Sequence, residues 1–171
     1  MISITDGQIF LESELFNAGV MPAVNPGISV SRVGGAAQIK AMKKVAGSLK
    51  LLYSQYRELH SFAQFGSDLD ADTKARLALG ERIVAVLKQK NNAPVEVAQQ
   101  VCILYAVVNG YLESVAVQDI PEFERRLEEH MDTRYEDVLK AIRSTGKLEA
   151  ATEDRLKEAL QSLLADMGGE L

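Results

Sequence analysis

One arginine in this sequence stands among small residues in a pattern that suits contact with a phosphate group. Arg32 lies in the segment GISVSRVG (residues 27–34), where glycines and serines on both sides favour a stiff loop that holds the guanidinium outward. A guanidinium in that setting can donate paired hydrogen bonds to a phosphate presented by a neighbouring subunit. On composition alone, a surface ion pair is the preferred interpretation, and the phosphate contact is the alternative.

Motifs for independent catalysis are missing from the sequence. It contains none of GxxxxGK[ST], GxGxxG, HExxH and CxxC, so nucleotide hydrolysis or metal catalysis by this chain alone is not predicted. His60 and His130 fall on different predicted helices without companion ligands, and we interpret both as structural. Cys102 is the only cysteine and stands in the apolar run VCIL, which predicts a small buried hydrophobic residue rather than a nucleophile. No metal site is therefore predicted.

The overall composition is that of an ordinary globular protein. Of the 171 residues, 47% are hydrophobic and 25% are charged, and the formal net charge is -5. The acidic balance argues against a nucleic acid as the main partner. The apolar stretches are too short or too interrupted to cross a bilayer, and the first residues lack the pattern of a secretory signal. Any membrane association is therefore expected to go through partners.

The elements that must position Arg32 lie in the first 35 residues, which differ from the rest. Alternation predicts a short strand at residues 2–4, and an apolar run predicts another at residues 9–11, with a turn at Asp6 and Gly7 between them. Prolines and glycines favour an ordered loop over residues 21–35. Because two isolated strands are marginal in water, we expect their pairing partners to be missing from this chain and the segment to be truncated.

From Ala36 onward the spacing of apolar residues is that of helices. Stripes at three- and four-residue intervals predict five main helices, with end signals at Asp70, Asn109 and Gly146. Their expected ranges are residues 36–66, 70–90, 94–108, 121–145 and 152–167. The predicted fold class is mainly α: a compact helical bundle of about five main helices, preceded by a short β/loop segment.

Four segments of the sequence resemble one family closely. They are ISITDGQIFL (residues 2–11), GISVSRVG (27–34), QYRE (55–58) and FGSDLD (65–70), and they are similar to the alpha subunit of the bacterial rotary F-type ATP synthase. The match is collinear over essentially the whole chain. The resemblance implies two domains: residues 1–35 would be a remnant of the nucleotide-binding domain, and residues 36–171 the C-terminal helical bundle domain. The family's N-terminal β-barrel and phosphate loop have no counterpart in this sequence.

The resemblance implies a catalytic role for the segment that carries Arg32. Arg32 matches the arginine that the alpha subunit extends into the catalytic site of the adjacent beta subunit, where it would act in trans as an arginine finger. Ser29 matches a serine of the same loop that is needed for activity, and Ser3 resembles a residue near the same interface. Such fingers contribute about 10³ to 10⁵ in turnover, or ~4 to 7 kcal/mol of barrier, because charge builds on the transferring phosphoryl group.

A second set of residues matches the family's non-catalytic nucleotide site. The resemblance implies that Gln89 and Asn91 contact adenine and that Phe16 and Pro22 form its apolar surround, whereas Met21 stands where relatives often have a basic residue. Without the resemblance, the stretch around Gln89 would be interpreted as a solvated helix end. ATP or ADP with Mg is the expected cofactor of the parent complex. Tight binding to this fragment is not expected, because it lacks the phosphate loop.

The implied function is that of the regulatory, non-catalytic alpha subunit of a proton-transporting ATP synthase. Its implied partners are the beta subunits, the gamma rotor subunit, which an acidic turn at residues 67–72 would face, and the delta subunit through the parent alpha subunit. The parent complex would lie peripherally at the cytoplasmic face of the bacterial cell membrane, and the isolated fragment would be inactive. The alternative, from a different class, is a stand-alone helical protein-interaction module without nucleotide function.

Overall fold

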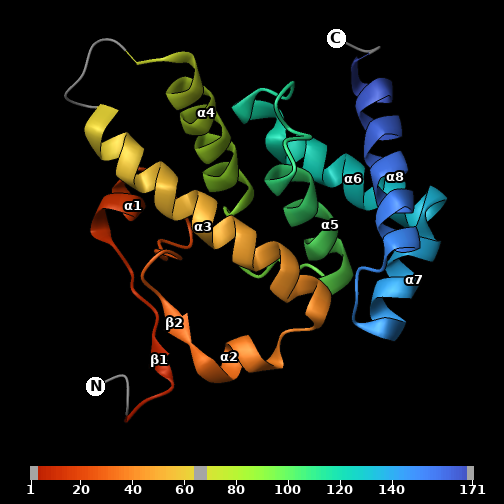
Figure 1. Ribbon diagram of the computed structural model, residues 1–171, viewed down its shortest axis with the longest axis horizontal. Coiled ribbons are helices and arrows are strands. Elements are labelled where there is room, and N and C mark those ends of the chain that lie inside the picture. The colour runs from red at the N-terminus through yellow and green to blue at the C-terminus, as the bar shows by residue number, and fades with distance from the viewer. Residues whose placement is uncertain (1–3, 64–68, 169–171) are drawn as a thin grey trace.

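Helices make up most of the protein. The computed structural model describes residues 4–63 and 69–168, and Figure 1 shows the large helices gathered beside an N-terminal segment with little regular structure. The large helices are α3 (Lys40–Ala63), α4 (Ala71–Val86), α5 (Val97–Val108), α6 (Ile120–Arg134), α7 (Glu136–Thr145) and α8 (Ala150–Gly168), with a short 3₁₀ turn, η1 (Val117–Asp119), before α6. The predicted fold class, mainly α after a short β/loop segment, is confirmed.

The core is one continuous cluster of buried apolar side chains. Helix α5 packs against α3, α4, α6 and α7, and α8 packs against α6 and α7. The space between them is filled by side chains with essentially no exposure to solvent, including Ile83, Val101, Phe123, Leu127, Met131, Leu139, Ile142, Leu156 and Leu160. Cys102 is buried in the same cluster, as predicted, and burial raises the pKa of its thiol to about 12. Each buried side chain of this size stabilises the fold by about 1.5–3 kcal/mol, so the helices depend on one another.

Three of the predicted helix ends are confirmed. The carboxylate of Asp70 accepts a hydrogen bond from the backbone N–H of Thr73 at 2.8 Å and caps α4. Asn109 ends α5, and Gly146 ends α7 in the left-handed conformation, with φ at 65°. The start of α5 differs from expectation: Pro94 lies before the helix, and Glu96 is its N-cap instead.

The fourth predicted helix is two helices. Tyr135 leaves the helical conformation, with φ at −131° and ψ at 33°, and separates α6 from α7. Its ring is buried 5.1 Å from the ring of His130 and lies beneath the guanidinium of Arg155 at 4.5 Å. The sequence hides this break because Met131, Tyr135 and Leu139 keep a four-residue spacing across it.

The N-terminal segment departs most from the predictions. β1 (Gly7–Gln8) pairs antiparallel with β2 (Val30–Ser31), and an isolated bridge joins Leu11 to Val24. The strand expected at residues 9–11 is therefore wrong apart from the bridge at Leu11, and the one expected at residues 2–4 lies largely outside the described residues. β1 pairs within the chain, and the expectation that the natural partners of the two expected strands are missing stays a prediction.

Two short helices also appear in this segment. α1 (Ser13–Asn17) was not predicted, and α2 (Arg32–Ala37) stands where a loop was expected. The hydroxyl of Ser31 accepts a hydrogen bond from the N–H of Gly34 at 2.9 Å and so caps α2. Helices of five and six residues are too short to show a helical period in the sequence.

Candidate functional site

Arg32 is the first residue of α2 and directly follows β2. Its side chain is exposed, and Nη2 donates a hydrogen bond to the backbone carbonyl of Thr5 at 3.0 Å. Its backbone N–H donates to the carbonyl of Asp6 at 3.2 Å. The backbone at Arg32 is thus held by neighbouring elements, while the guanidinium stays at the surface.

The carboxylate of Asp6 holds the residues on both sides of Arg32. The hydroxyl of Ser31 donates to Asp6 Oδ2, and the N–H of Val33 donates to Asp6 Oδ1 at 2.6 Å. The hydrogen bond from Ser31, followed by that from Val33, lowers the pKa of Asp6 below its ordinary value. Because Asp6 stays ionised at neutral pH, it acts there as a fixed acceptor for the start of α2.

Ser29 lies on the far side of β2 from Arg32 and uses its hydroxyl within the chain. Oγ donates to the carbonyl of Asn25 at 2.6 Å and accepts from the N–H of Phe10 at 3.0 Å. Nζ of Lys50 on α3 donates to the carbonyl of Ser29 at 3.1 Å. The structure therefore places Ser29 and Arg32 on one segment, where the Ser29 side chain supports the backbone.

Pro22 and Gln89, two of the four residues expected around an adenine, lie close together in the structure. The N–H of Gln89 donates to the carbonyl of Met21 at 2.9 Å, which joins the end of α4 to the loop that holds Pro22. Pro22 follows a cis peptide bond and lines a cavity of about 240 Å³ with other mainly apolar residues: Val20, Val24, Pro26, Tyr53, Val84 and Leu87. Gln89 Nε2 donates to the carbonyl of Ala93 at 2.8 Å.

Phe16 and Asn91 are not part of that cavity. The side chain of Phe16 is 58% exposed at the end of α1, and Asn91 is exposed in the turn after α4. Ser3 and the first part of the acidic turn expected to face a rotor, residues 67 and 68, lie outside the described residues. The structure therefore brings Pro22 and Gln89 close together, and the contact of the four residues with adenine stays a prediction.

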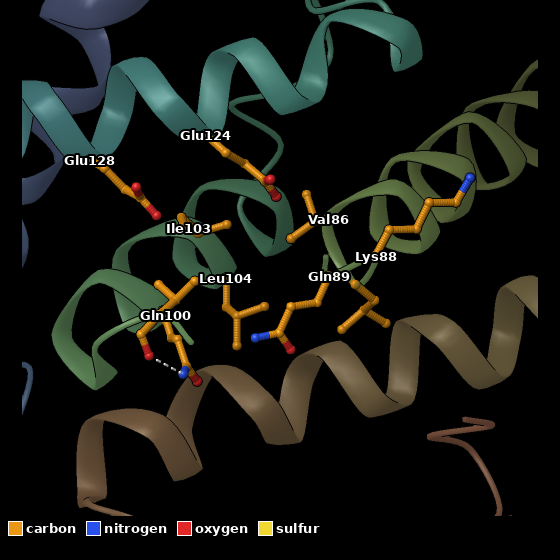
Figure 2. A pocket seen from close by; sticks show the side chains of 10 residues that line it. Val86, Lys88, Gln89, Gln100, Ile103, Leu104, Glu124 and Glu128 are labelled. Atoms are coloured by element: carbon orange, nitrogen blue, oxygen red, sulfur yellow. Dashed lines mark hydrogen bonds between the residues drawn. The ribbon is translucent and has the colours of Figure 1, made fainter. Parts of the chain in front are cut away.

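A second cavity, of about 210 Å³, was missed by the sequence analysis (Figure 2). Glu124 and Glu128 on α6 point into it from one side, Gln89 and Gln100 lie on the other, and apolar side chains such as Leu104 complete the lining. Burial, followed by the charge of Glu128, raises the pKa of Glu124 to about 7. The signal in the sequence was the i, i+4 spacing of two glutamates beside the apolar stripe of α6.

Features of metal sites and membrane spans are absent from the described part of the chain. Within residues 4–63 and 69–168, no group of three or more His, Cys, Asp or Glu residues is arranged to hold a metal ion. None of the helices in these ranges combines the length and apolar character needed to cross a bilayer. His130 is buried against Tyr135, and the ring of His60 lies tilted against that of Tyr56 with centroids 5.5 Å apart, so both histidines pack against an aromatic ring.

The fold is a helical bundle, and an exposed arginine lies in the segment before it. Residues 38–163 match the family model described as ATP synthase alpha/beta chain, C terminal domain. The chain belongs to this family, and the resemblance to the C-terminal region of the F-type ATP synthase alpha subunit is confirmed.

A curated relative supports the same assignment. The chain is 62% identical over 143 residues to a protein of Acetobacterium woodii named "ATP synthase subunit alpha, sodium ion specific". The matched region is 84% of this chain and 28% of the relative, so the chain spans little more than a quarter of that protein. The name specifies sodium ions, and similarity to it therefore does not support the expected proton coupling.

Proposed function

We propose that this chain works as the C-terminal region of an alpha subunit in an assembled ATP synthase, where Arg32 reaches the catalytic site of an adjacent beta subunit. In that role the guanidinium stabilises the negative charge that develops on the transferring phosphoryl group. The chain supplies the positive group and the partner supplies the phosphate pocket. Residues 1–35 then form the edge of a nucleotide-binding domain, and residues 36–171 form the helical domain.

The observation that supports this proposal most is the contrast between the backbone and the side chain of Arg32. Asp6 holds the backbone of Arg32 and Val33, and Ser31 caps the helix that begins there. The guanidinium donates to the carbonyl of Thr5 and is exposed at the surface. A charged group on a fixed backbone loses little conformational freedom when it meets a phosphate, which favours action on a partner's ligand.

We further propose that the loop around Pro22 and the end of α4 cover the adenine of a non-catalytic nucleotide. The apolar cavity beside Pro22 and the hydrogen bond from Gln89 to Met21 support this placement. Phe16 and Asn91 are exposed nearby in the chain and free to meet a base held by the rest of an alpha subunit. ATP or ADP with Mg would be bound chiefly through a phosphate loop, which this sequence lacks.

The proposed partners follow from the same placement. Beta subunits flank the segment of Arg32, the gamma subunit faces the turn before α4, and the delta subunit is reached through the alpha subunit. The complex would sit peripherally on the cytoplasmic face of the membrane.

The test is the substitution Arg32→Lys in a full-length alpha subunit, assembled with beta and gamma subunits. We expect multisite ATP turnover to fall by about 10³-fold or more, because an ammonium lacks the paired donors of a guanidinium. Size-exclusion chromatography should show unchanged assembly. Arg134→Lys is the matched control, since Arg134 is exposed and forms an ion pair with Asp166 at 3.4 Å, outside both the segment of Arg32 and the turn before α4. Full turnover by the Arg32→Lys complex would refute the role of Arg32.

A further inference from the structure

Asn25 is a buried polar residue whose hydrogen-bonding groups are all engaged. Its side chain is 7% exposed, and only Gln99 and His130 are comparably buried polar residues in the described part of the chain. In those two residues a buried side-chain atom, Oε1 of Gln99 and Nε2 of His130, has no hydrogen-bond partner among the described residues. At Asn25, by contrast, the N–H donates to the carbonyl of Phe10 at 2.9 Å, and both side-chain polar atoms have partners. Such complete satisfaction of a buried amide favours one conformation strongly.

The hydrogen bonds of Asn25 shape the turn that leads to Arg32. Oδ1 of Asn25 accepts from the N–H of Gly27 at 2.9 Å. The carbonyl of Asn25 accepts from both the N–H and the hydroxyl of Ser29, at 3.2 and 2.6 Å. β2 begins directly after Ser29, and Arg32 directly follows β2. The turn therefore determines the position of the backbone at Arg32.

Asn25 also connects this turn to the helical bundle. Nδ2 of Asn25 donates to Oε1 of Glu12 at 2.8 Å, and Nη2 of Arg57 on α3 donates to Oε2 of the same carboxylate at 3.3 Å. The ion pair is partly shielded from solvent on both sides. A continuous chain of hydrogen bonds therefore runs from α3 through Glu12 and Asn25 to Ser29.

We propose that Asn25 is a positioning residue for Arg32: through Gly27, Ser29 and Glu12 it anchors the segment that carries the guanidinium onto α3. The inference rests on the proposed function of Arg32. Asn25 itself touches no substrate in this account. Its loss is expected to leave the guanidinium present but displaced, and a displacement of roughly 1 Å can cost about 10²-fold in rate.

The anchor can be tested first in this chain by amide hydrogen exchange. Asn25→Ala should speed exchange at Gly27 and Ser29 by about tenfold or more, because their acceptors are lost or freed to move. Asn17→Ala is the matched control, because Asn17 is exposed in the same segment. The double variant Asn25→Asp with Glu12→Gln reverses the donor and acceptor between the two side chains and keeps the net charge, so it should restore slow exchange. Unchanged exchange at Gly27 and Ser29 in Asn25→Ala would overturn the inference, and this outcome does not depend on the role of Arg32 in catalysis.

The link to Arg32 is tested in the assembled complex with a double-variant cycle. Asn25→Ala should lower kcat by about 10- to 100-fold while KM changes by less than about threefold, because substrate is not contacted. Asn25→Ala combined with Arg32→Lys should be no slower than Arg32→Lys alone, because Asn25 acts through Arg32.

Other outcomes separate the two proposals. Losses that multiply in the double variant would overturn the positioning role. Full turnover of Arg32→Lys, together with faster exchange in Asn25→Ala, would instead remove the role of Arg32 and support Asn25 only as the anchor of the segment.

Discussion

Gly80 on α4 lies directly against the ring of Tyr56 on α3. A Cβ atom at Gly80 would stand 2.0 Å from Cδ2 of that ring and 2.1 Å from Cγ. No side chain larger than hydrogen fits there without moving the ring. The close approach of α3 and α4, which carries Tyr53 and Val84 to the cavity beside Pro22, therefore depends on this glycine.

Gly80→Ala is predicted to destabilise the protein although alanine favours a helix. The gain in helix propensity is about 1 kcal/mol, whereas overpacking against a ring costs about 1–3 kcal/mol. We expect a net loss on the order of 1 kcal/mol in the free energy of unfolding, measured by urea denaturation. Gly47→Ala in α3 is the control, because nothing lies within 4 Å of its Cβ position, and it should be stabilising. Equal stabilisation by both substitutions would contradict the packing of Tyr56.

Tyr105→Phe is predicted to weaken the junction of α3, α5 and α8. The hydroxyl of Tyr105 donates to Oε1 of Glu153 at 2.9 Å, and Nζ of Lys44 donates to Oε2 of the same carboxylate at 2.6 Å. Removal of the hydroxyl should cost about 1–2 kcal/mol of unfolding free energy. Tyr111→Phe serves as the control in the same denaturation experiment. Identical midpoints for the two variants would mean that the hydroxyl of Tyr105 contributes nothing.

Arg82→Lys is predicted to loosen the loop between α5 and η1. Arg82 Nε donates to the carbonyls of Leu112 at 2.7 Å and Val115 at 3.2 Å, and Nη2 donates to that of Glu113 at 3.0 Å. A lysine cannot replace this planar fork of donors, so we expect a loss of about 2 kcal/mol in thermal or chemical denaturation. Arg76→Lys, on the exposed side of α4, should change stability by less than about 0.5 kcal/mol. If Arg82→Lys also lowered the free energy of unfolding by less than about 0.5 kcal/mol, water would be replacing these hydrogen bonds.

Glu124 is predicted to make stability depend on pH. Burial, followed by the charge of Glu128, raises its pKa in the folded protein to about 7, from an ordinary value of 4.5. Between these values the folded protein binds more protons at Glu124 than the unfolded chain does, so this residue lowers stability as pH rises from 4.5 towards 7. Above about pH 7 the cost is complete, on the order of 2 kcal/mol after allowance for its partial exposure.

Glu124→Gln should therefore be more stable than the parent chain at pH 8, and the difference should shrink as pH falls towards 4.5. Unfolding midpoints measured across this pH range provide the check. Glu129→Gln is the control on the same helix, because Glu129 is exposed and pairs with Arg125 at 3.2 Å. A difference between Glu124→Gln and the parent that does not vary with pH would contradict a titrating Glu124.

The sequence predicted the parts of the fold that follow a local rule. The long apolar stripes located α3 to α8 approximately, and Asp70 and Gly146 marked helix ends because caps act on their own backbone neighbourhood. The break at Tyr135 was missed because it depends on where a ring is buried. α1 and α2 were missed because they are too short to have a period.

The contacts of the candidate site were harder to predict from the sequence. The resemblance drew attention to Arg32 and Ser29, but the residues that hold their segment include ones distant in the chain, such as Asp6 at Val33 and Phe10 at Ser29. No local pattern pairs Glu12 with Arg57, which are 45 positions apart. Tertiary contacts of this kind depend on the whole fold. The contacts of Pro22, Gln89, Phe16 and Asn91 with adenine stay predictions, as do the catalytic roles of Arg32 and Ser29.

The most direct test of the account is a structure of the assembled complex with nucleotide and a phosphoryl transition-state analogue in the beta-subunit site. We predict that the guanidinium of Arg32 will have left the carbonyl of Thr5 and lie about 3 Å from oxygens of the analogue. A guanidinium that stays on Thr5, or points into solvent away from the analogue, would contradict the central claim.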